Sequence, residues 1–132
     1  MIAVDTNILV RYAVKDDHKQ TVTATEFLKN NRCFIHKTVL LELAWVLSSS
    51  AGYALVRSIV AERLRHICGL TTITVEDASA AKQTIDWFEQ GMDFADALHL
   101  AASEELSGFA TMDRKLVSKA AKVAIGAKVI QL

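Results

Sequence analysis

The sequence contains no proline, five glycines, two cysteines and no net charge. Cys33 and Cys68 are too few for a disulfide framework and lack metal-ligand spacing, so we interpret both as buried thiols. A net charge of zero excludes a global basic field, so any nucleic-acid site has to come from local clusters of charge. The chain has no apolar run of about 18 residues and no amino-terminal signal pattern. We therefore expect a cytoplasmic protein without a membrane partner.

The composition is that of a folded domain. The 132 residues are 52% hydrophobic and 23% charged, which is enough for a substantial core and for solubility. The few glycines fall between periodic segments, and no linker, repeat or low-complexity stretch interrupts the chain. We expect one domain over residues 1–132.

Short apolar strands alternate with helices along the whole chain. The predicted strands cover residues 2–4, 33–35, 72–75, 109–111 and 129–130. The predicted helices cover residues 7–13, 21–29, 39–47, 53–68, 77–89, 93–106 and 114–122, with Thr38 as a cap of the third. This alternation favours an α/β fold with a parallel sheet flanked by helices.

Four acidic residues occupy special positions in this pattern. Asp5 and Asp113 follow the ends of strands, and this edge of an open α/β sheet is where ligands and catalytic groups collect. Glu42 and Asp96 lie in helices that are otherwise apolar, where a buried carboxylate requires a partner. Four carboxylates gathered together would repel one another unless a divalent cation held them. The first functional hypothesis is therefore a metal site.

Each acid also has a simpler interpretation. Asp5, Asp93 and Asp113 could be helix N-caps, because aspartate is a favoured capping residue. Glu42 could be a surface glutamate beside exposed leucines.

Two neighbours of Asp5 favour the metal site over a simple cap. Thr6 and Asn7 place further oxygen-bearing side chains beside its carboxylate, which suits a hard cation and its supporting groups.

The acids and their contexts form four blocks in a characteristic order. The blocks are Ile2-Ala3-Val4-Asp5-Thr6-Asn7, Val39-Leu40-Leu41-Glu42-Leu43-Ala44-Trp45-Val46-Leu47, Asp93-Phe94-Ala95-Asp96-Ala97-Leu98-His99-Leu100-Ala101 and Phe109-Ala110-Thr111-Met112-Asp113-Arg114-Lys115-Leu116. Together they resemble the PIN-domain family and, within it, the VapC-type toxins of bacterial toxin–antitoxin pairs.

The resemblance implies a three-layer α/β/α sandwich with a central, mostly parallel sheet. It also implies a Mg²⁺- or Mn²⁺-dependent endoribonuclease that forms a homodimer, with an antitoxin that blocks the site and joins the toxin on operator DNA. The family's acidic quartet falls on Asp5, Glu42, Asp96 and Asp113. Its supporting polar positions fall on Asn7 and Thr111, and a less uniformly acidic one falls on Asp93. Met112 departs from the family, in which a polar residue is common at that position.

The charges are distributed unevenly along the chain. Residues 76–105 carry eight acids against Lys82 alone. The stretch after Asp113 is basic, with Arg114, Lys115, Lys119, Lys122 and Lys128. This asymmetry predicts a basic rim that contacts RNA phosphates beside an acidic metal pocket, with Arg11 and Lys15 adding to it. The alternative is an ordinary solvated basic helix.

Two other functions remain as alternatives. An aspartyl-phosphate phosphatase also places an aspartate after the first strand, but such enzymes typically have Asp-x-Asp, whereas this chain has Asp5-Thr6-Asn7. A binding module that acts only in a complex with its antitoxin or DNA would have no need of the intact acidic set.

Overall fold

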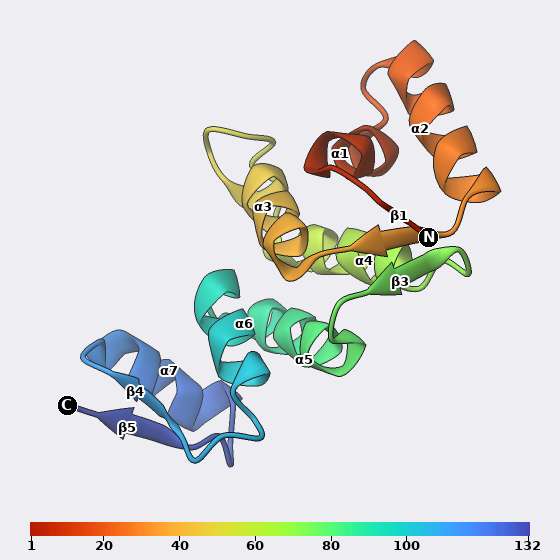
Figure 1. The fold of residues 1–132 in the computed structure, drawn as a ribbon. Helices are drawn as coiled ribbons and strands as arrows, with labels where there is room; N and C mark the ends of the chain where they lie inside the picture. Colours follow the sequence, from red (N-terminus) through yellow and green to blue (C-terminus); the bar gives the residue numbers. More distant parts are fainter. The chain divides into compact units, whose positions relative to one another are not determined.

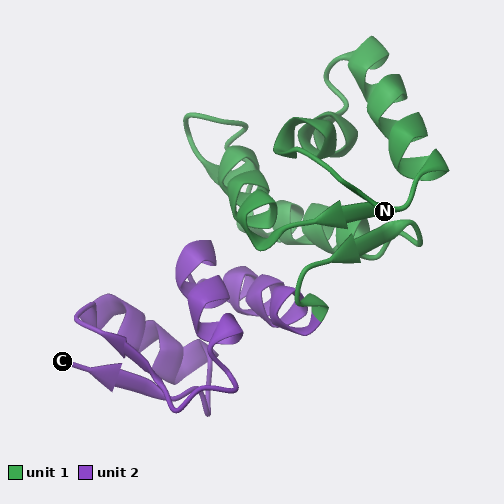
Figure 2. Ribbon diagram, viewed as in Figure 1, with its two compact units in different colours: residues 1–78 green, residues 79–132 purple.

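Five short strands lie in two sheets, and every neighbouring pair of strands runs parallel. The structure is a computed structural model that describes all residues from Met1 to Leu132. The chain divides into two units, residues 1–78 and residues 79–132, which are coloured separately in Figure 2. One sheet belongs to each unit. Parallel strands alternating with helices confirm the predicted α/β class.

Residues 1–78 contain three strands and four helices (Figure 1). The strands are β1 (Ile2–Ala3), β2 (Cys33–Ile35) and β3 (Ile73–Val75), in the spatial order β1-β2-β3. The helices are α1 (Thr6–Val14), α2 (His18–Asn30), α3 (Lys37–Ser48) and α4 (Arg57–Cys68). Cys33 pairs with Ile2 on one side and with Ile73 on the other, so β2 is the central strand. Its side chains Cys33 and Ile35 are fully buried.

The helices of this unit bury one shared apolar core. Helix α1 contacts α2, α3 and α4, and α4 also contacts β3. The largest fully buried side chains of these elements are Leu9, Leu28, Ile35, Leu40, Leu43, Leu47, Val60, Leu64 and Ile67. Burying one such side chain contributes about 1.5–3 kcal/mol, so this core holds α1 and α3 in place. These two helices carry Asp5 at their start and Glu42, respectively.

Residues 79–132 form the second unit around a smaller sheet. Helix α5 (Ala78–Glu89) begins at the boundary and is followed by α6 (Phe94–Ala102), β4 (Phe109–Thr111), α7 (Arg114–Val123) and β5 (Val129–Gln131). Gly91 turns the chain between α5 and α6 with φ +112°, a conformation that favours glycine. The buried cluster of this unit consists of Met92, Ala97, Leu100, Leu116, Ala120 and Ala124.

Several predicted helix boundaries were wrong, and α2 begins at His18 rather than at residue 21. Helix α3 begins at Lys37 with His36 as its cap, so Thr38 does not cap it. Helix α4 begins at Arg57 rather than at residue 53, because residues 53–55 fold back: the backbone amides of Tyr53 and Leu55 donate to the last carbonyls of α3, and Ala54 has φ 49°. Helix α6 ends at Ala102, and residues 103–106 form turns. None of the seven helices is long and apolar enough to cross a membrane.

Candidate metal centre

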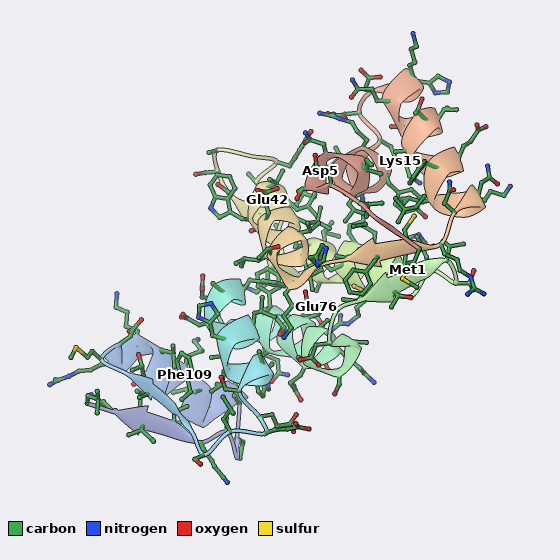
Figure 3. All side chains as sticks on the ribbon, viewed as in Figure 1. Met1, Asp5, Lys15, Glu42, Glu76 and Phe109 are labelled. Carbon is green, nitrogen blue, oxygen red and sulfur yellow. The ribbon has the colours of Figure 1, made fainter.

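Asp5 both follows a strand and caps a helix. The parallel pairing extends past β1, because the Val4 amide donates to the Phe34 carbonyl at 3.1 Å. Asp5 is the N-cap of α1, and its Oδ1 accepts from the Thr6 amide at 2.6 Å. The simpler interpretation of Asp5 as a cap is therefore correct, yet the cap uses only one carboxylate oxygen. Figure 3 shows Asp5 at the start of α1. The residue is exposed, and the cap leaves its second carboxylate oxygen for another ligand.

Thr6 presents an unsatisfied polar atom next to this carboxylate. Its side chain is 4% exposed, and its Oγ1 has no hydrogen-bond partner. A buried hydroxyl without a partner destabilises a fold by about 1–3 kcal/mol. Asn7, the next residue, is exposed at the first turn of α1. The polar group beside Asp5 thus fits a bound water or another ligand that the protein alone does not supply.

The expectation that Glu42 is buried was wrong. Helix α3 buries Leu40, Leu43, Ala44 and Leu47, which form one face. Glu42 and Trp45, one turn apart, lie on the exposed side, and Trp45 is 59% exposed. This mostly apolar helix therefore has one face exposed to solvent. The carboxylate of Glu42 (Figure 3) lies on that face, where water solvates its charge and no counter-charge is required.

Three acids influence one another within residues 79–132. Asp96 is half-buried in the first turn of α6, and Asp93, the N-cap, accepts from the Asp96 amide at 3.1 Å. Partial burial raises the pKa of Asp96, and the negative charges of Asp93 and Asp113 raise it further, while His99 acts in the opposite direction. Of the carboxylates in question, Asp96 is therefore the one in greatest need of a nearby positive charge.

Asp113 has two hydrogen-bonded roles at the start of α7. Its Oδ1 accepts from the amides of Lys115 and Leu116 at 2.9 and 3.2 Å, so it too is an N-cap. Its own amide donates to the Thr111 hydroxyl at 3.0 Å. Thr111 thus holds the backbone of Asp113 at the end of β4. Met112 between them is 80% exposed and takes no part in this arrangement.

The donor set fits a hard divalent cation by its chemistry. All four candidate ligands are carboxylates, which suit Mg²⁺ or Mn²⁺, and mutual repulsion already acts on Asp96. No three His, Cys, Asp or Glu side chains are gathered closely enough in the structure to hold a metal ion. Asp5 and Glu42 belong to residues 1–78, and Asp93, Asp96 and Asp113 belong to residues 79–132.

The predicted basic residues separate into two groups. Arg114, Lys115 and Lys119 line a shallow depression of about 410 Å³ on α7 together with Ser118 and Lys122. Ser118 was missed from the sequence, although its place one turn after Arg114 on the same helix face could have indicated it. Arg11 lies in the other unit and is paired with Asp16 at 2.7 Å.

Comparison with protein families identifies a match to the PIN domain over residues 2–122. Comparisons with curated proteins and with solved structures gave no match. The family match covers all four acidic blocks and nearly the whole chain, which confirms the family to which those blocks were assigned. PIN domains have an α/β fold, typically bind divalent metals and are generally metal-dependent nucleases. The chain therefore belongs to the PIN domain family.

Proposed function

We propose that the protein is a Mg²⁺- or Mn²⁺-dependent endoribonuclease that acts as the toxin of a toxin–antitoxin pair. The observation that carries the proposal is that Asp93 and Asp113 lie near enough to Asp96 for their negative charges to add to the effect of burial in raising its pKa. Carboxylates that repel one another beside a strand end are stabilised when a cation binds between them. Membership of a nuclease family supports the same conclusion.

The residues divide into ligands and supporting groups in this proposal. Asp5, Glu42 and Asp96 would hold the first metal, directly or through water, and Asp113 would complete a second site or position the attacking water. When bound, the cation supplies positive charge for the phosphate oxygens and lowers the pKa of a water.

Each supporting residue has a definite task. Thr111 fixes the backbone of Asp113 through the 3.0 Å hydrogen bond. Asn7 and the unpaired Thr6 hydroxyl provide polar groups beside Asp5, and Asp93 fixes the first turn of α6 by capping it.

The substrate is proposed to be RNA held by its phosphates. Helix α7 begins at Asp113 and presents Arg114, Lys115, Lys119 and Lys122 on its exposed side, while Leu116 and Ala120 face the core. No salt bridge neutralises these four cations. A row of free cations that starts at a proposed ligand suits a polyanion whose scissile phosphate lies at the metal.

The remaining proposals concern partners. We propose a homodimer, an antitoxin that blocks the acidic site, and operator DNA bound through the antitoxin. A cytoplasmic location follows from such a role.

The test is cleavage of total cellular RNA by the purified protein with Mg²⁺ or Mn²⁺, with Asp5→Asn beside it. Asparagine caps a helix as well as aspartate does, so this change removes charge but keeps α1. We expect the activity to fall at least about a hundredfold, because even supporting groups of metal sites contribute 10–100-fold. Asp17→Asn is the matched control, because Asp17 caps α2 by accepting from the Gln20 amide at 3.0 Å. This variant should cleave RNA as the wild type does.

Four results would contradict the nuclease proposal. Cleavage that survives Asp5→Asn, or that continues in EDTA, would rule out the proposed site. If calorimetry shows that Mn²⁺ binds but no RNA is cleaved, a binding module would be favoured. A phosphoenzyme intermediate would favour the phosphatase.

The toxin role has a separate test in cells. Expression of the wild type should arrest bacterial growth, whereas Asp5→Asn should not. Co-expression of a small reading frame found immediately upstream should relieve the arrest. Growth arrest that persists with Asp5→Asn would contradict a toxin that acts by RNA cleavage.

A further inference from the structure

A groove between α1 and α2 shares only Asn7 with the residues assigned to the metal site above. Helix α1 contributes Asn7, Ile8 and Arg11 to it, and α2 contributes Lys19, Gln20 and Phe27 among others. Its volume is about 720 Å³, which lies within the range of about 300–1,000 Å³ typical of ligand sites. The Thr21 hydroxyl donates to the Arg11 carbonyl at 3.2 Å and ties α2 to α1 beside the groove.

The groove combines an apolar floor with a polar rim. Ala24 is buried at 6% exposure, and the side chains of Ile8 and Phe27 are half-buried. The exposed amides of Asn7 and Gln20 stand at the rim. An apolar floor with an aromatic ring and amides at its edge matches the face and the edge of a nucleobase.

The charged groups of the groove are all cationic, since no carboxylate lines it. Lys19 is exposed and has no ion pair. Arg11 bonds to Asp16 and Tyr53 through Nη1 alone, at 2.7 and 3.5 Å, so its Nε and Nη2 remain available. These two cations complement the phosphates that flank a base.

We infer that this groove binds unpaired bases of the RNA next to the Asp5 carboxylate, an inference that rests on the proposed function. Asn7, which lines the groove, lies two residues after Asp5 in the first turn of α1. An RNA strand with one phosphate at Asp5 therefore places its neighbouring bases at the groove. Phe27 stacks on a base, Asn7 and Gln20 contact its edge, and Lys19 and Arg11 contact phosphates. Single-stranded RNA is the class of substrate, because paired bases cannot enter between two helices.

A helix from a partner protein is the competing occupant. Such a helix would fill the groove mainly through apolar contacts. The amides and the unpaired Lys19 at this rim favour a polyanion with planar bases instead.

The test measures binding of a fluorescein-labelled single-stranded RNA of about ten nucleotides by fluorescence anisotropy in EDTA, which prevents cleavage. Phe27→Leu keeps an apolar side chain of similar size but removes the aromatic ring. We expect about tenfold weaker binding, because stacking of one base contributes that much or more. Phe27→Trp should restore the affinity. An oligomer of abasic ribose-phosphate units should bind Phe27→Leu and the wild type equally.

A second pair of variants tests the cations. Lys19→Ala should weaken binding and lower the slope of log affinity against log salt by about 0.7. Lys29→Ala is the matched control, because Lys29 is exposed on α2 but does not line the groove.

The outcomes separate this inference from the proposed function. If the wild type cleaves RNA while Phe27→Leu and Lys19→Ala bind and cleave as it does, the groove assignment is wrong and the nuclease stands. If the wild type neither binds nor cleaves RNA, both are wrong. If the groove variants keep their RNA affinity but no longer bind a co-expressed partner protein, the groove binds that protein and the RNA assignment is wrong.

Discussion

The hydroxyl of Thr111 accepts a hydrogen bond from the backbone amide of Asp113 at 3.0 Å. This bond joins the end of β4 to the first residue before α7, so it sets the position from which the Asp113 carboxylate acts. Thr111→Val should lower RNA cleavage by about tenfold, as loss of a supporting group in a metal site does. The free energy of unfolding should fall by less than about 1 kcal/mol, because water can take over the exposed amide. Thr111→Ser keeps the hydroxyl and should restore cleavage; equal activity of Thr111→Val would argue against this role.

Asp113 allows its capping and chemical roles to be separated. Asp113→Asn keeps the cap of α7 but removes the charge, so thermal stability should stay nearly unchanged while cleavage is lost. Asp113→Ala removes both and should also destabilise the fold by about 1 kcal/mol. Asp17→Ala, which removes the cap of α2, is the control that should lose similar stability yet retain activity. Cleavage by Asp113→Asn at the wild-type rate would show that Asp113 acts only as a helix cap.

The buried hydroxyl of Thr6 should have opposite effects on stability and activity. Thr6→Val removes an Oγ1 that has no partner, so metal-free protein should unfold at a higher temperature, with a gain of about 1 kcal/mol or more. RNA cleavage should fall, because the hydroxyl supports the site at Asp5. Calorimetry in EDTA and a cleavage assay measure the two effects. A lower unfolding temperature for Thr6→Val would show that the hydroxyl has a partner within the protein.

Cys68 should be an unreactive thiol. Burial raises its pKa to about 11, so at neutral pH it holds about two orders of magnitude less thiolate than an ordinary cysteine. Peptide-resolved alkylation by iodoacetamide should therefore rise only toward pH 11, and a midpoint near 9 would contradict this.

The same pKa shift has a consequence for stability. The folded state keeps the proton that the unfolded state loses, so the free energy of unfolding should fall as the pH rises from about 9 toward about 11. Cys68→Ser should remove this part of the pH dependence, which urea titrations at several pH values would measure.

Local sequence predicted strand β2 and strand β4 with their observed bounds. It also indicated that Asp5, Asp93 and Asp113 could cap helices, as all three do. Caps and strand ends are readable in this way because a capping side chain contacts amides only one to three residues ahead. The acidic blocks were sufficient to identify the family for the same reason, because each block is a continuous run of sequence.

Asp5 by itself illustrates the division between sequence and structure. The sequence determined that it follows a strand, caps a helix and stands among polar neighbours. Only the tertiary structure decided that the neighbouring Thr6 hydroxyl is buried without a partner, that Glu42 is exposed, and that α1 and α2 enclose a groove. These properties depend on which elements pack against each helix face. That packing is set by contacts between residues far apart in the chain, which the periodicity of a single segment does not contain.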